Sequence, residues 1–136
     1  LGYDKPPLAE AITRLNEMTT VIVMIESREA VANVDAIAAV DGVDILFVGA
    51  SDLSVEMEKP GDYRDPEVLG ALEAIAAACR RHGKIAGLGG IGDHALLAGL
   101  IGHGYRFILA ANDLDLMMIA GKARTRDLRA LGDTPC

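Results

Sequence analysis

Two carboxylate side chains follow short apolar runs that are typical of buried β-strands. Glu26 comes directly after residues 21–25, and Asp52 comes soon after residues 45–48. If these strands are neighbours, they lie about 4.8 Å apart, and both carboxylates could reach one cation at about 2.0–2.1 Å. No Cys or His stands nearby, and oxygen ligands alone suit a hard ion such as Mg²⁺ or Mn²⁺. The alternative is structural: Glu26 lies in the first turn of the next helix and Asp52 caps a short one, both favoured by the helix dipole.

A glycine-rich segment suggests a second chemistry. Residues 87–92 match G-x-G-x-x-G between an expected strand and an expected helix, and Asp113 follows about 20 residues later, as in a dinucleotide-binding fingerprint. Two features oppose this interpretation. Asp93 would stand at the helix N-terminus where a pyrophosphate must bind, and only one further helix is expected after Asp113, whereas the motif should open a nucleotide domain. The alternative is a glycine turn that lets substrate or backbone approach closely.

Other reactive side chains have simpler interpretations. Cys79 falls on an apolar stripe with helical spacing and is expected to be a small buried hydrophobe. His82 and His103 each precede a glycine at an expected helix end, where a cation interacts favourably with the helix dipole. Ser51 has no neighbouring histidine in the sequence, so a nucleophilic serine is unsupported.

The elements that must position these residues alternate between short strands and helices. Each expected strand is a continuous apolar run, as in strands buried on both faces, and the helices carry apolar stripes. This pattern predicts an α/β domain with a parallel sheet whose strand C-terminal ends all lie on one face. The expected strands are residues 21–25, 45–48, 84–88 and 107–110, and the expected helices are residues 8–18, 29–40, 65–82, 94–101 and 115–131.

Composition limits the class of protein. The 136 residues are 51% hydrophobic with a formal net charge of −7, which fits a globular protein and excludes a disordered tail. Twenty acidic side chains against thirteen basic ones disfavour a nucleic-acid partner. No apolar run approaches the ~18 residues of a membrane-spanning helix, and nothing at the start is typical of a signal peptide. Because no apolar run could span a membrane, we expect no membrane partner. Two cysteines are too few for a disulfide framework, so we expect a cytoplasmic location.

Two long segments carry a family resemblance. Residues 21–44 read VIVMIESREAVANVDAIAAVDGVD, and residues 47–54 read FVGASDLS. Together they resemble the HpcH/HpaI family of class II, metal-dependent pyruvate aldolases. The similarity continues through residues 65–68 (DPEV), 83–84 (GK) and 110–113 (AAND), so it covers nearly the whole chain.

The resemblance implies a fold and a domain organisation. The family has an α/β fold, the (β/α)8 TIM barrel, and residues 1–136 look like its C-terminal half, covering approximately strands five to eight with their helices and no internal domain boundary. A half-barrel leaves open strand edges and an uncovered interior. An N-terminal half-barrel is therefore expected as a partner, supplied by the same gene product or by a separate chain. The family also implies a homo-oligomer.

The resemblance assigns roles to the residues at the strand ends. Glu26 and Asp52 would bind a divalent metal ion (Mg²⁺, Mn²⁺ or Co²⁺). The backbone of Gly49, Ala50 and Ser51 would hold the carboxylate of pyruvate. The implied reaction cleaves a small 4-hydroxy-2-oxo acid to pyruvate and an aldehyde through a metal-stabilised enolate.

The chain departs from the family pattern at several points. Met24 stands where family members often carry a glutamine, and Ala50 replaces the proline of the G-P-x-D-L-S loop. The family's catalytic histidine and substrate-binding arginine lie in the first half of the barrel, so both are expected outside this chain. Two other function classes stay open: a Rossmann-like dinucleotide-binding segment, and a non-catalytic half-barrel that acts only as an interaction protein.

Overall fold

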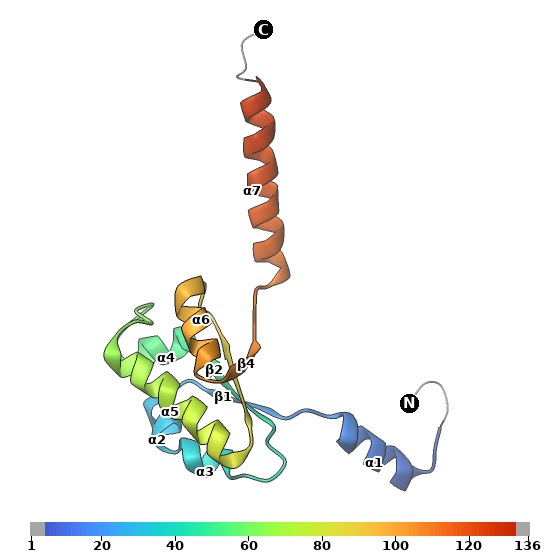
Figure 1. The fold of residues 1–136 in the computed structure, drawn as a ribbon. Helices are drawn as coiled ribbons and strands as arrows, with labels where there is room; N and C mark the ends of the chain where they lie inside the picture. The colour runs from blue at the N-terminus through green and yellow to red at the C-terminus, as the bar shows by residue number, and fades with distance from the viewer. Residues whose placement is uncertain (1–4, 133–136) are drawn as a thin grey trace.

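A four-stranded sheet organises the chain, and its strands are parallel and lie side by side in chain order (Figure 1). The computed structural model describes residues 5–132. The expected α/β architecture with a parallel sheet is confirmed, and each strand lies within two residues of its predicted position. The strands are β1 (Ile22–Ile25), β2 (Ile45–Gly49), β3 (Ile85–Gly89) and β4 (Tyr105–Ile108).

Helices precede, connect and follow these strands. All five expected helical segments are helical, although their boundaries differ by a few residues. The helices of the described residues are α1 (Leu8–Met18), α2 (Arg28–Ala32), α3 (Val34–Ala38), α4 (Ala50–Glu56), α5 (Pro66–His82), α6 (His94–Gly102) and α7 (Asp113–Gly132).

Two regions differ from the helices that the sequence predicts. The single helix expected over residues 29–40 is wrong, because the chain breaks into α2 and α3 at Asn33. The Asn33 side chain donates to the Glu29 carbonyl at 2.9 Å, and such side chains compete with the backbone for helix hydrogen bonds. The sequence alternative of a short helix capped by Asp52 corresponds to α4, but the cap of α4 is Gly49, and Asp52 lies inside its first turn.

Helices α2 to α6 gather beside the sheet and cover one of its faces (Figure 1). Successive side chains of a strand point to opposite faces, so Leu46 and Val48 share the face that enters the core. Ile25 from β1 and Leu88 from β3 lie in the same core, and all four side chains are at most 1% exposed. The core therefore lies between the sheet and these helices.

The opposite face of the sheet has no covering layer in the part of the chain that the structure describes. Met24, Phe107 and Leu109 are 50%, 42% and 59% exposed although they are large and apolar. Ile22 and Ile85 are also more than 40% exposed. A contiguous exposed apolar surface of this kind usually marks a contact with another protein surface.

Helix α5 has the ends that the sequence predicts. The Asp65 carboxylate accepts from the Glu67 amide at 2.9 Å, and Pro66 occupies the first turn. At the other end, Gly83 adopts the left-handed conformation with φ of 66°. The long central helix of the core is thus fixed at both ends by local chemistry.

Helices α1 and α7 lead away from the sheet on different sides (Figure 1). Neither helix contains a buried residue. Their large apolar side chains are exposed: Leu8 is 76% exposed, Met18 71% and Met117 63%. Over residues 5–132, every helix is too short or too polar to cross a lipid bilayer.

Tyr105 links β4 to α5 and makes the stability of the fold depend on pH. Its side chain is fully buried, and its hydroxyl donates to the Leu72 carbonyl at 2.9 Å. Burial raises the pKa of Tyr105 above its ordinary value. The tyrosine of the unfolded chain ionises near pH 10, so the stabilisation is complete below about pH 10 and is lost as the pH rises toward the folded pKa.

We expect the free energy of unfolding to fall by up to about 1.4 kcal/mol per pH unit above about pH 10 through this residue. Tyr105→Phe removes that contribution and costs about 1 kcal/mol at pH 8 through the lost hydrogen bond. Urea denaturation between pH 8 and about 11 measures both effects. Tyr63→Phe, at a partly exposed tyrosine, is the matched control and should keep the slope. Equal slopes in the wild type and in Tyr105→Phe would contradict the assignment.

Candidate functional site

The pairing of β1 with β2 brings the two predicted metal ligands to one place. Ile25 lies opposite Val48 in the parallel register, so Glu26, the next residue, follows at the level of Gly49. Helix α4 begins directly after Gly49, and its first turn contains Asp52. Glu26 and Asp52 line the same cavity of about 180 Å³, together with Gly49, Ala50 and Ser51. The expectation that their strands are neighbours is confirmed.

Gly49 is required by the position of the Glu26 side chain. A Cβ atom at Gly49 would overlap Glu26 Oε1 and would lie 2.9 Å from Glu26 Cγ and 3.0 Å from its Cδ. Real Cβ atoms do not approach other heavy atoms this closely. The absence of a side chain at Gly49 therefore lets the Glu26 carboxylate lie against the backbone at the start of α4.

The two carboxylates of this cavity have no cationic partner in the structure. Within residues 5–132, neither the Glu26 nor the Asp52 side chain takes part in a hydrogen bond or an ion pair, whereas Asp35 and Asp93 each pair with an arginine. The Glu26 and Asp52 carboxylates are therefore available to a bound cation. Their oxygen ligands fit a hard divalent ion.

The described residues supply a small number of ligands for such an ion. Over residues 5–132, no group of three or more His, Cys, Asp or Glu side chains is arranged to hold a metal. A site with two protein carboxylates leaves coordination positions for water and for oxygen atoms of a substrate, as is usual for Mg²⁺. The arrangement therefore fits an open, substrate-binding metal site better than a closed structural one.

Apolar side chains line the rest of the cavity, with Phe47 as its largest wall residue. Phe47 is 8% exposed and meets Phe107 edge to face, with ring centroids 5.9 Å apart and planes at 77°. A Cβ atom at Gly87 would lie 2.9 Å from Phe47 Cδ2, and one at Gly89 would lie 3.0 Å from its Cζ. Two glycines of the G-x-G-x-x-G segment thus make room for this ring.

Gly90, within the same segment, makes room for Ser51. Gly90 has a positive φ of 90°, and a Cβ atom there would lie 2.9 Å from Ser51 Oγ and 3.4 Å from the Ser51 amide nitrogen. The end of β3 can therefore approach the start of α4 closely. The structure favours the expectation of a glycine turn that permits close approach over that of a dinucleotide fingerprint.

The helix that follows the glycines already holds an anion of its own. The Asp93 carboxylate accepts from the amides of Ala95 and Leu96 at 3.0 and 3.1 Å, and it pairs with Arg64 at 2.6 Å. These hydrogen bonds, first from Leu96 and then from Arg64, hold the pKa of Asp93 below its usual range. Asp113, the acidic residue expected at a ribose, accepts from the Leu114 amide at the start of α7.

The expectation of a buried Cys79 is confirmed, and His82 lies at the helix end where the sequence places it. Cys79 is 1% exposed, and burial raises the pKa of its thiol. His82 lies 3.2 Å from Asp35 at the end of α5. Ser51 Oγ lies 3.3 Å from the hydroxyl of Tyr63 and has no histidine as a hydrogen-bond partner among the described residues.

Several cavity residues were missed by reasoning from the sequence alone. Phe47 could have been found, because strand alternation places it on the same face as Gly49. Leu109 also lines the cavity, but the register of β4 against β3 changes between Ala86 and Gly87, and no local pattern predicts this shift. The contact between Tyr63 and Ser51 depends on the loop after α4, which has no periodic pattern.

Comparison with known proteins shows the family to which this chain is similar. Residues 6–120 match the family described as HpcH/HpaI aldolase/citrate lyase. The chain is 41% identical over 124 residues to the 4-hydroxy-4-methyl-2-oxoglutarate aldolase tasA of Hapsidospora irregularis, covering 88% of this chain and 45% of the relative. It is 37% identical to a hydroxypyruvate/pyruvate aldolase of Pseudomonas aeruginosa, covering 82% of this chain and 41% of the relative.

Solved structures share the fold as well. A crystal structure of an HpcH/HpaI aldolase/citrate lyase family protein from Burkholderia cenocepacia superimposes with a TM-score of 0.79 at 33% identity, covering 88% of this chain and 46% of that one. The solved structures of the family are TIM-barrel-like. The chain spans about half the length of the relatives it matches.

The contact between Gly49 and Glu26 generates a direct test of the site. Gly49→Ala should displace the Glu26 carboxylate and weaken Mn²⁺ binding about tenfold or more, because positioning errors at metal ligands have effects of that size. The fold should persist, since the displaced atoms belong to a flexible side chain. Isothermal titration with Mn²⁺ and thermal unfolding measure the two properties.

Gly70→Ala is the matched control for this substitution, because a Cβ atom at Gly70 meets nothing within 4 Å. It should leave Mn²⁺ affinity unchanged. Equal affinities of Gly49→Ala and Gly70→Ala would show that the position of Glu26 is irrelevant to ion binding.

Proposed function

Because the chain belongs to the HpcH/HpaI aldolase/citrate lyase family, we propose that it is the C-terminal half of a (β/α)8 barrel, covering strands five to eight. Its four consecutive parallel strands and its length relative to the relatives support this assignment. The exposed sheet face with Met24, Phe107 and Leu109 would then be the interior of the barrel. Residues 1–136 would form this half without an internal domain boundary.

The partner that completes the barrel is an N-terminal half-barrel. The outer edges of β1 and β4 pair with no strand within the described residues, and a parallel sheet with open edges is prone to unspecific pairing. A complementary half would pair with both edges and cover the apolar interior. Helices α1 and α7, which have no buried residue, would pack in this assembly or in a homo-oligomer.

We propose that the completed barrel is a metal-dependent aldolase, a carbon–carbon lyase. The observation that carries this proposal is the pair of neighbouring carboxylates, Glu26 and Asp52, in one cavity without a cationic partner among the described residues. The names of the relatives support the reaction class, since each is an aldolase that acts on a small oxo acid. The substrate would be a 4-hydroxy-2-oxo acid, cleaved to pyruvate and an aldehyde.

In this proposal Glu26 and Asp52 hold a divalent ion such as Mg²⁺, Mn²⁺ or Co²⁺. When bound, the ion supplies positive charge that polarises the 2-oxo group and stabilises the negative charge of the enolate. The backbone of Gly49, Ala50 and Ser51 receives the carboxylate of the oxo acid, because these residues line the cavity beside both metal ligands. Phe47 excludes water from the inner side.

Cleavage also requires a base that this chain does not supply in our proposal. The base removes the proton of the 4-hydroxyl group, the C3–C4 bond breaks, its electron pair forms the C2–C3 double bond of the enolate, and the aldehyde leaves. A proton then added to C3 gives pyruvate. We assign the base, and an arginine that binds the anionic substrate, to the N-terminal half. The hydroxyls of Ser51 and Tyr63 lie 3.3 Å apart, and neither has a histidine as a hydrogen-bond partner among the described residues.

The metal assignment predicts the effect of removing each ligand. Glu26→Gln and Asp52→Asn should each lower Mn²⁺ affinity at least tenfold, because an amide oxygen is a weaker ligand for a hard cation than a carboxylate. In the completed barrel, pyruvate release from a 4-hydroxy-2-oxo acid should stop on chelation and return with Mg²⁺ or Mn²⁺. Coupled lactate dehydrogenase reports the pyruvate.

Glu73→Gln, at an exposed carboxylate of α5, is the matched control and should bind Mn²⁺ like the wild type. Unchanged affinity in both ligand variants would refute the metal site. A folded barrel that binds Mn²⁺ through these residues and yet releases no pyruvate would instead support the non-catalytic alternative.

The half-barrel assignment predicts the behaviour of the chain by itself. Expressed alone, residues 1–136 should self-associate or bind hydrophobic dyes, because Met24, Phe107 and Leu109 on the inner sheet face are 42–59% exposed. Addition of an N-terminal half should convert it to a defined complex. Sedimentation velocity measures the assembly state. A stable, compact monomer of the isolated chain would contradict the half-barrel proposal.

A further inference from the structure

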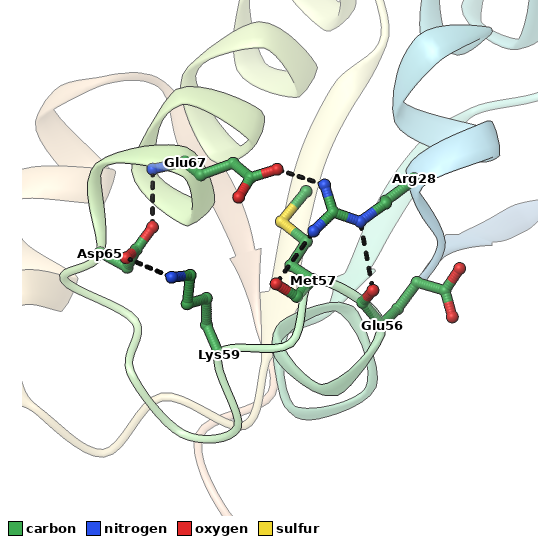
Figure 2. A network of polar contacts seen from close by, with 6 residues as sticks. All are labelled: Arg28, Glu56, Met57, Lys59, Asp65 and Glu67. Atoms are coloured by element: carbon green, nitrogen blue, oxygen red, sulfur yellow. Dashed lines mark hydrogen bonds and ion pairs between the residues drawn. The ribbon is translucent and has the colours of Figure 1, made fainter.

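Arg28 connects the two elements that carry the proposed metal ligands. It is the first residue of α2 and stands two residues after Glu26. Its Nε donates to the Glu56 carbonyl at 3.2 Å, and its Nη2 donates to the Met57 carbonyl at 2.9 Å (Figure 2). Both carbonyls belong to the C-terminal end of α4, whose first turn holds Asp52.

The guanidinium binds α4 where the helix is best able to accept a cation. The last carbonyls of a helix have no partners within the helix and carry its partial negative charge. The planar fork of arginine donates to two such oxygens from two nitrogen atoms in a fixed geometry, whereas the ammonium of lysine is a single point of charge. Met57 itself is 4% exposed, so the backbone that Arg28 holds is anchored in the core.

A short helix transmits this contact to the metal ligand. Helix α4 has seven residues and is too short to be stable without tertiary contacts. At about 1.5 Å per residue, Asp52 lies only about 6 Å along the axis from Glu56. A shift of the C-terminal end of α4 therefore moves Asp52 by a similar amount.

The contact of Arg28 with α4 completes a closed series of links that contains both Glu26 and Asp52. Glu26 and Arg28 are joined through Ser27, whose side chain accepts from the Ala30 amide at 3.1 Å and so fixes the start of α2. From Arg28 the series passes through α4 to Asp52, and it returns through Gly49 to Glu26 by the pairing of β1 with β2. Both carboxylates thus belong to one closed unit.

The same guanidinium also reaches the start of α5. Arg28 Nη1 pairs with the Glu67 carboxylate in the first turn of α5 (Figure 2). Asp65, the cap of α5, pairs with Lys59 at 3.5 Å, which ties the loop after α4 to the same point. These two ion pairs therefore connect the C-terminal end of α4 to the N-terminal end of α5, the central helix of the core.

We infer that Arg28 is a positioning residue that sets the separation of the Glu26 and Asp52 carboxylates. This inference rests on the proposed metal site. Arg28 does not line the cavity of the two carboxylates and acts through α4. The competing interpretation is a surface staple without influence on the site. Arg28 is 46% exposed, and exposed ion pairs contribute little stability, so thermal unfolding alone does not separate the two interpretations.

The test compares Mn²⁺ affinity in four variants, in whichever form, alone or joined to an N-terminal half, the wild-type chain binds Mn²⁺. Arg28→Gln should lower affinity about tenfold, because it removes both contacts to α4. Arg28→Lys keeps the charge but loses the fixed two-nitrogen geometry of the guanidinium, so about threefold loss is expected. Glu67→Gln removes only the ion pair to α5 and should lie near the wild type.

Arg81→Gln is the matched control, because Arg81 makes a similar exposed fork with Asp35 at the opposite end of α5. Affinity in Arg28→Gln within twofold of Arg81→Gln would overturn the inference. If Arg28→Gln does not fold, Arg28→Lys decides in the same way. Failure of the wild type to bind Mn²⁺, or binding that is insensitive to Glu26→Gln, would instead reject the proposed metal site, and this inference with it.

Discussion

The parallel register of β1 against β2 is the constraint on which the candidate site depends. It places Glu26 at the level of Gly49, and the missing side chain of Gly49 lets the carboxylate lie at the start of α4. Because α4 begins at the next residue, Asp52 comes to the same cavity within three positions. A slip of the register by one residue would turn Glu26 to the other face of the sheet and separate the pair. The site is thus a consequence of strand pairing rather than of a long loop.

The second constraint is the one-sided burial of the sheet. Leu46, Val48 and Leu88 pack against α2 to α6, whereas the apolar side chains of the other face are exposed in the described structure. The cavity with Glu26 and Asp52 opens at the edge of this exposed face, with Phe47 as its wall. In our proposal the same missing layer explains both the exposed surface and the missing base. The N-terminal half would both cover the exposed face and supply the base.

Local patterns predicted the parts of the fold that depend on local chemistry. The caps of α5, the four apolar strands and the neighbourhood of Glu26 and Asp52 follow from capping residues and strand ends. The break at Asn33 and the register shift between β3 and β4 were not predictable, because a side-chain hydrogen bond and tertiary packing decide them. The role that we infer for Arg28 was not predictable for the same reason, because its partners lie 28 to 39 positions away in the sequence. A charged residue in a helix's first position has no local signal that distinguishes it from solvated ones.

In our proposal, Glu26 and Asp52 together hold a divalent ion at the ends of β1 and β2. The most direct measurement is an anomalous difference map from crystals of the protein grown with Mn²⁺. We expect one strong peak within about 2.2 Å of carboxylate oxygens from both residues, with further coordination by water. Absence of a peak between these carboxylates at millimolar Mn²⁺, or a peak held by other residues, would contradict it.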